Sequence, residues 1–233
     1  MLMLKKWEDL PDDLRVPEVR PYYDILSKRR FSLLFKRVFD VVCALIVLIA
    51  LAIPMAVIAL AVKLDSPGPV IFRQERVTKY GKTFRIHKFR TMVRDADRKG
   101  GAVTVKGDAR ITRVGGKLRR LRLDETPQLF DVLSGNMSFV GTRPEAVKYV
   151  DRYEPEWRAT LLLPAGITSE ASIRFKDEDV LLDGARDVDA AYVGRVLPEK
   201  MKYNLDSIRR FRFFGEIATM FRTVLAVCGK EYK

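Results

Sequence analysis

The sequence contains a run of 22 residues without a charge, at positions 41–62 (VVCALIVLIALAIPMAVIALAV). A straight helix of this length would be about 33 Å long, which is enough to cross a hydrocarbon core of about 30 Å. Pro54 interrupts the run and predicts a kink or break, because proline removes a helix hydrogen bond and clashes with the preceding turn. We therefore expect two apolar helical halves that meet near Pro54.

Basic residues flank this run on both sides, and they constrain its orientation. They are Lys28, Arg29, Arg30, Lys36 and Arg37 before the run, and Lys63, Arg73, Arg76 and Lys79 after it. Basic flanks favour the cytoplasm, so a segment with two such flanks is expected to enter and leave the membrane by the same face. The sequence favours this re-entrant arrangement over a simple transmembrane anchor, and both over a buried helix of a soluble domain.

The charge of the chain is concentrated directly after the apolar run. Residues 63–122 carry 18 basic and 5 acidic side chains, a surplus that equals the +13 of the whole protein. Such a block needs an anionic counterpart, which could be nucleic acid, acidic lipid or a phosphorylated substrate. A hydrophobic content of 48% excludes a disordered chain, and a single histidine excludes multi-histidine metal sites.

The remaining pattern predicts a helix-rich domain with one small antiparallel hairpin. Residues 70–76 and 82–89 resemble its two strands, and residues 116–122 and 126–133 resemble helices hinged at 123–125. Residues 145–163 are expected to be helical and 164–168 to form a turn. Residues 1–30 are expected to form a loosely structured arm with short helices, because Pro11, Pro17 and Pro21 break any long helix. An apolar face with arginine edges at 209–227 suits an interfacial helix or, equally, a core helix.

One acidic pair lies in a position that suits phosphate chemistry. Asp124 and Glu125 stand near a predicted helix start, with Arg119 before them and Arg143 after them. Arginines keep nearby carboxylates ionised and match phosphate geometry, so an ionised carboxylate beside them could attack phosphorus. The simpler alternatives are a helix cap for the acidic pair and a solvated or lipid-facing surface for the arginines.

Six motifs in one order give the chain a specific resemblance. They are FKRVFD (35–40), PGPVIF (67–72), HKFRTM (87–92), LDETPQL (123–129), MSFVGTRP (137–144) and PAGIT (164–168). Together they resemble the bacterial sugar transferases, a family of monotopic phosphoglycosyl transferases, over roughly residues 31–228. The resemblance implies transfer of a sugar-1-phosphate from a UDP-sugar to undecaprenyl phosphate, with release of UMP, at the first membrane step of glycan assembly.

The resemblance also assigns roles to particular residues. It implies that Asp124 is the nucleophile of a covalent aspartyl intermediate and that Glu125 assists it with Mg²⁺ or proton handling. Both carboxylates would then be the Mg²⁺ ligands. It places Arg119 and Arg143 at phosphate-binding positions, and Pro54 at the bend of the membrane helix.

The expected fold class is therefore irregular α/β, attached to the membrane by a re-entrant helix and interfacial amphipathic helices. We expect an arm at 1–30, an amphipathic lead and membrane helix at 31–64, and a catalytic domain at 65–233. Both termini would face the cytoplasm at the bacterial inner membrane, where anionic lipids attract the basic block. The sequence does not set the oligomeric state or the sugar. Two other functions remain open, a basic nucleic-acid-binding domain and a non-catalytic membrane scaffold, although no nucleic-acid recognition motif is evident.

Overall fold

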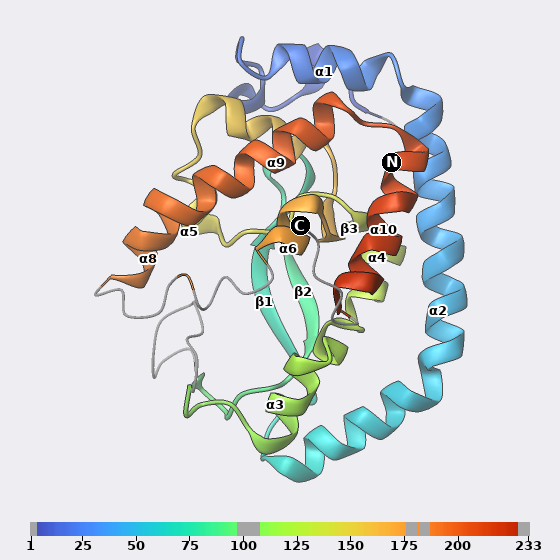
Figure 1. Ribbon diagram of the computed structural model, residues 1–233, viewed down its shortest axis with the longest axis vertical. Coiled ribbons are helices and arrows are strands. Elements are labelled where there is room, and N and C mark those ends of the chain that lie inside the picture. The colour runs from blue at the N-terminus through green and yellow to red at the C-terminus, as the bar shows by residue number, and fades with distance from the viewer. Residues whose placement is uncertain (1–3, 97–107, 176–180, 182–186, 228–233) are drawn as a thin grey trace.

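The computed structural model describes residues 4–96, 108–175, 181 and 187–227. Its α-helices are α1 (Arg20–Ser27), α2 (Arg30–Asp65), α3 (Arg113–Arg120), α4 (Gln128–Ser134), α5 (Val147–Val150), α6 (Glu170–Arg174), α8 (Val188–Ala191), α9 (Leu197–Arg209) and α10 (Phe213–Val227). Its strands are β1 (Ile71–Val77), β2 (Thr83–Phe89), β3 (Met137–Val140) and β4 (Ala165–Thr168). Short 3₁₀ segments include η5 (Leu123–Glu125) and η6 (Pro155–Leu162), and a π-helical turn, η7 (Tyr192–Val196), precedes α9. The strands lie at the centre of the domain and helices surround them (Figure 1).

The apolar run forms the middle and end of α2, a single helix of 36 residues. The sequence predicted two halves separated at Pro54, but the helix continues through this residue. Figure 1 shows that α2 descends along one side of the domain and then turns beneath it, so the chain bends without leaving the helical conformation. A proline inside a helix is a common cause of such a bend.

One face of α2 exposes apolar side chains, whereas Leu33, Ala44 and Val62 on the other side are buried against the domain. In its most apolar window, with a mean hydropathy of 3.1, only 6% of the residues are buried. All but one of the exposed large apolar residues of α2 recur every three or four positions and form a stripe: Phe31, Phe35, Val38, Val42, Ile46, Ile49, Ile53, Val57, Leu60 and Leu64; Leu45 is exposed beside it. The buried residues of α2 include charged ones, Lys36 and Asp40. An exposed apolar stripe of this length indicates contact with lipid.

Both ends of α2 are bound to the same domain. Near its start, Asp40 accepts a hydrogen bond of 2.7 Å from the Ser138 hydroxyl in β3. At its end, Arg90 Nη2 donates to the carbonyl oxygens of Val62 and Ser66, at 3.1 and 2.6 Å. Arg90 follows β2, so the hairpin holds the C-terminal end of the helix.

The predicted hairpin is confirmed, and a second sheet was not foreseen. β1 and β2 pair antiparallel, with Gln74 opposite Ile86. β3 and β4 form a separate parallel pair, with Ser138 opposite Gly166. The prediction of a turn at 164–168 is therefore wrong, because most of this segment is β4. A four-residue strand carries too little periodicity to be recognised without its partner.

The N-terminal segment is not loosely structured. Its apolar side chains belong to the largest hydrophobic core, together with residues of η6 and α9: Leu4, Leu10, Leu14, Val19, Tyr22, Tyr23 and Leu26 are all buried. The prolines do exclude a long helix, and α1 begins only at Arg20. The segment instead folds back over α9, as Figure 1 shows.

The C-terminal helix α10 carries an exposed aromatic face. Phe214 and Phe221 are 80% and 68% exposed, whereas Phe211, just before the helix, is 2% exposed and belongs to the main core. The alternative of a core helix therefore holds for Phe211 but not for the outer face of α10. That face adds to the apolar surface of α2, because the two helices lie side by side (Figure 1).

Two glycines allow the second sheet to continue into the loop that carries Arg143. A Cβ atom added to Gly166 would lie 2.2 Å from the backbone nitrogen of Gly141. We predict that Gly166→Ala lowers the free energy of unfolding by about 3 kcal/mol, because backbone atoms cannot move aside cheaply. Denaturant unfolding in detergent measures this. Gly194→Ala is the control, since a Cβ there meets nothing within 4 Å; an equal loss in both variants would contradict the prediction.

Candidate active site

The acidic pair lies in a tight turn between two helices. α3 ends at Arg120, Arg122 adopts a left-handed conformation (φ 56°), and the pair follows in η5 before α4 begins. A non-glycine residue in this region is uncommon and reverses the chain sharply. The N-cap position of α4 is Pro127, and no side chain caps it. The helix-cap alternative for the acidic pair is therefore not supported.

Glu125 is held by two cations from different elements. Its Oε1 accepts a hydrogen bond of 3.0 Å from Lys88 Nζ of β2, and it pairs with the guanidinium of Arg143 from the loop after β3. The Glu125 side chain is only 11% exposed. Burial alone would raise its pKa, but the charges of Arg143 and Lys88 hold the pKa well below its usual range. Glu125 is therefore a firmly ionised anchor.

Asp124 has a different environment, although it is the adjacent residue. It is buried, and among the described residues no side chain pairs with its carboxylate. Burial and the negative charge of Glu125 raise its pKa, and the charges of Lys88 and Arg119 oppose this only in part. The sequence suggested that the arginines would act on the pair together. The structure instead directs Arg143 to Glu125 and leaves Asp124 the more basic of the two carboxylates.

Arg119 approaches the acidic pair from α3. Its Nε donates a hydrogen bond of 2.9 Å to the Thr91 hydroxyl, which fixes the direction of the side chain. Burial lowers the pKa of Arg119, and the negative charge of Asp124 opposes this shift only in part. The two groups are therefore electrostatic neighbours. α3 can come this close because Gly115 packs against the Thr91 carbonyl, where a Cβ would lie 2.1 Å from the oxygen.

The structure brings four predicted site residues together and leaves one apart. Asp124, Glu125, Arg119 and Arg143 belong to one cluster, whereas Pro54 lies within α2 and concerns the membrane helix alone. Lys88 is a member of the cluster that residue-by-residue reasoning missed. Its position in the HKFRTM motif was a possible signal, but only the folded hairpin directs its side chain at Glu125.

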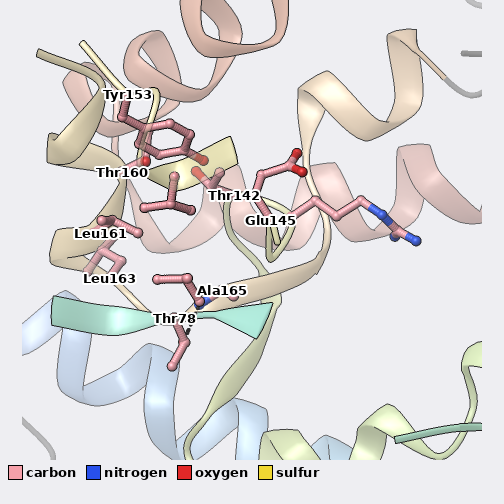
Figure 2. Close-up of a pocket in the computed structure, with 11 residues that line it drawn as sticks. Thr78, Thr142, Glu145, Tyr153, Thr160, Leu161, Leu163 and Ala165 are labelled. Atoms are coloured by element: carbon pink, nitrogen blue, oxygen red, sulfur yellow. Dashed lines mark hydrogen bonds between the residues drawn. The ribbon is translucent and has the colours of Figure 1, made fainter. Parts of the chain in front are cut away.

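A small cavity lies on the other side of Arg143. Figure 2 shows Thr78, Thr142, Glu145, Tyr153 and Thr160 around it. Neither residue of the acidic pair lines this cavity, and its size suits a water molecule rather than a sugar. This cavity is therefore not the space in which a sugar would reach Asp124.

Within the described residues, no group of three or more His, Cys, Asp or Glu side chains could hold a metal ion. Asp124 and Glu125 supply two carboxylates. That number fits Mg²⁺, which proteins commonly bind through one or two carboxylates together with water and substrate phosphates. It does not fit a site built from protein ligands alone.

Comparisons with known proteins identify the family of the chain. A family model described as bacterial sugar transferase matches residues 31–230. A provisionally named undecaprenyl-phosphate N-acetylgalactosaminyl 1-phosphate transferase of Bacillus subtilis is 47% identical over 58% of this chain and 75% of its own length.

Two further relatives match more of this chain. A UDP-N-acetylgalactosamine-undecaprenyl-phosphate N-acetylgalactosaminephosphotransferase of Aeromonas hydrophila is 34% identical over 82% of this chain, but over only 43% of its own length. A UDP-glucose:undecaprenyl-phosphate glucose-1-phosphate transferase of Caulobacter vibrioides is 37% identical over 81% of this chain and 68% of its own length.

The two carboxylates should titrate separately, and each variant should move the pKa of Asp124 in a known direction. Glu125→Gln removes a neighbouring negative charge, so the pKa of Asp124 should fall; Lys88→Met removes a positive one, so that pKa should rise. Infrared titration of the carboxyl band, assigned with Asp124→Asn, measures the pKa. An unchanged pKa in both variants would contradict the electrostatic coupling.

Proposed function

Because this chain belongs to the bacterial sugar transferase family, we propose that it moves a sugar-1-phosphate from a UDP-sugar to undecaprenyl phosphate and releases UMP. The observation that carries this proposal is the difference between the environments of the two carboxylates of the acidic pair. Glu125 is neutralised by Lys88 and Arg143, whereas Asp124 is buried, forms no side-chain ion pair within the described residues and has a raised pKa. The more basic of two carboxylates, and the one that is not paired with a cationic side chain, is the better nucleophile.

The proposed reaction consists of two displacements at the same phosphorus. In the first, an Asp124 oxygen attacks the sugar-bearing phosphorus, and the bond to the bridging oxygen breaks, so that UMP leaves with this oxygen. In the second, a phosphate oxygen of undecaprenyl phosphate attacks the enzyme-bound phosphorus, and the bond to Asp124 breaks. The products are the lipid diphosphate sugar and the free carboxylate, and no proton is required in either step at neutral pH.

Arg119 and Arg143 are suited to bind the phosphate oxygens during these steps. Both lie beside the acidic pair, and a guanidinium can hold a phosphate through two parallel hydrogen bonds. Charge develops on the non-bridging oxygens during each attack, and fixed positive groups in a site shielded from water stabilise it. We propose that Asp124 and Glu125 also hold Mg²⁺, which when bound would offset the negative charge of the diphosphate.

We further propose that α2 enters and leaves the membrane by the cytoplasmic face. The tethers at Asp40 and Arg90 support this, because a helix bound to one domain at both ends would have to pull part of that domain through the bilayer in order to span it. The outward apolar stripe would lie in one leaflet, next to the lipid acceptor. The exposed basic residues of the block at 63–122, such as Lys82 and Lys117, would then attract anionic headgroups at the inner membrane of a bacterium.

A covalent adduct on Asp124 is expected when UDP-sugar and Mg²⁺ are supplied without acceptor. Mass spectrometry of the detergent-solubilised protein should find the phosphosugar on the peptide that contains Asp124. Asp124→Asn should abolish both the adduct and UMP release. Glu125→Gln should reduce turnover by about 10²-fold or more, because it removes the partner of two cations.

The control variant is Asp151→Asn, which removes an exposed carboxylate and should leave turnover unchanged. Parallel double-reciprocal lines are expected from the two-step route. Intersecting lines without a trapped adduct would show direct attack within a ternary complex. Absence of UMP release from a panel of UDP-sugars, in a folded protein, would favour the non-catalytic scaffold.

The topology has its own test. Cysteines introduced at the exposed positions Lys28 and Lys82, in an otherwise cysteine-free chain, should both resist an impermeant reagent applied to intact cells. Pro54→Ala should favour a straight helix, since proline in a helix costs about 3 kcal/mol relative to alanine. The variant should therefore shift toward a two-sided orientation and lose activity. If only one of the two cysteines is labelled in the chain that retains Pro54, α2 spans the membrane.

A further inference from the structure

Three polar residues near the start of α2 point into the domain and bind β3 and α4, the two elements that lie next to Arg143 and the acidic pair in the chain. Lys36 Nζ donates a hydrogen bond of 2.8 Å to the carbonyl oxygen of Val140, the last residue of β3. Lys36 also pairs with Glu216 of α10; the two side chains are 8% and 16% exposed. Asp40 accepts hydrogen bonds from the Ser138 hydroxyl and the Phe139 backbone, at 2.7 and 3.3 Å. Most of β3 is therefore tethered to the membrane helix.

β3 leads directly to Arg143, and the intervening chain has little freedom. The backbone nitrogen of Gly141 donates to the Thr168 carbonyl at 3.0 Å, and that of Gly166 donates to the Thr142 carbonyl at 2.9 Å. Gly141 and Gly166 are also packed too closely for any side chain. A displacement at the end of β3 would therefore reach Arg143 rather than be absorbed on the way.

The third residue, Arg37, binds the other side of the site. Its guanidinium donates to the carbonyl oxygens of Val132 and Leu133, at 2.6 and 2.9 Å. These carbonyls end α4, the short helix that follows the acidic pair. One turn of α2 thus holds both β3, which precedes Arg143, and α4, which follows Glu125. The distance between β3 and α4 determines whether the side chains of Arg143 and Glu125 meet.

We propose that Lys36 and Glu216 are positioning residues, which set Arg143 against Glu125 by holding the carbonyl of Val140. This inference rests on the proposed function, because it assigns the pair a part in the same reaction. It also makes the seating of α2 and α10 at the membrane a condition for an assembled active site. Neither residue touches the substrate.

A buried ion pair can also serve stability alone, and paired replacements separate the two roles. Removal of one partner leaves an uncompensated buried charge and destabilises the fold, whereas replacement of both by apolar residues of similar size is often neutral. Lys36→Met/Glu216→Met should therefore keep the melting temperature within a few degrees of the unmodified chain. It leaves the Val140 carbonyl without its donor, so a positioning role predicts that turnover stays low.

The decisive experiment is a double-mutant cycle between Lys36 and Arg143 in nanodiscs. Single-turnover UMP release should fall about 10- to 100-fold in the Lys36→Met/Glu216→Met chain, the loss expected from a misplaced catalytic group. In an Arg143→Ala background the same pair of substitutions should lower this rate by less than about threefold, because the side chain that Lys36 and Glu216 position is already absent. Lys6→Met is the control, since it removes an exposed lysine outside the membrane helix, the basic block and the candidate site, and should leave the rate unchanged.

A second measurement needs no substrate and separates this inference from the proposed function. If Arg143 moves away, the pKa of Glu125 should rise in the Lys36→Met/Glu216→Met chain, as measured by infrared titration of the folded protein. Full additivity in the cycle, or an unchanged pKa of Glu125, would overturn the positioning role. If the unmodified chain releases no UMP, the proposed function fails, and the pKa measurement still decides whether Lys36 and Glu216 position Arg143.

Discussion

The structure depends on a helix that turns its apolar side chains away from its own domain. α2 exposes an apolar stripe along its length, while Lys36, Asp40 and the carbonyl oxygens at its C-terminal end are bound by the domain. In water this distribution would be unfavourable, since apolar surface is exposed while charge is buried. In a bilayer it places apolar side chains against lipid and satisfies the polar groups inside the protein. This distribution is therefore compatible with a helix that lies in a membrane.

The basic residues at 63–122 make several different kinds of contact, and the net charge of the block alone does not show which residue makes which contact. Arg90 binds backbone carbonyls at the end of α2, Lys88 neutralises Glu125, and Arg119 lies beside Asp124. Other members, such as Lys82 and Lys117, are exposed and available to lipid headgroups. The charge surplus predicted an anionic partner, but the assignment of each cation required the folded hairpin and α3 to bring distant segments together.

The sequence predicted the features that depend on residues close together in the chain and missed those that depend on distant residues. The apolar run, the hairpin and the turn at the acidic pair depend on residues close in sequence, and each was predicted. β4 escaped prediction because its partner strand β3 lies 28 positions earlier, measured from Met137 to Ala165. The burial of the N-terminal segment depends on η6 and α9, which are farther still. Lys88 belongs to the same group, since its role exists only where β2 meets Glu125.

The adjacent carboxylates show how one site can assign two roles to similar groups. Glu125 has two cationic partners, so its negative charge is stabilised and its oxygens are poor nucleophiles. Asp124 shares the burial but not the partners, and the charge of Glu125 raises its pKa further. Environments that drive neighbouring pKa values apart are a general means of separating catalytic roles. Here the separation depends on Arg143 staying with Glu125. A shift of this guanidinium toward Asp124 would lower the pKa of the proposed nucleophile and would remove one of the two cations that neutralise Glu125. The contacts that fix the end of β3 are for this reason as important to the proposed chemistry as the acidic pair itself.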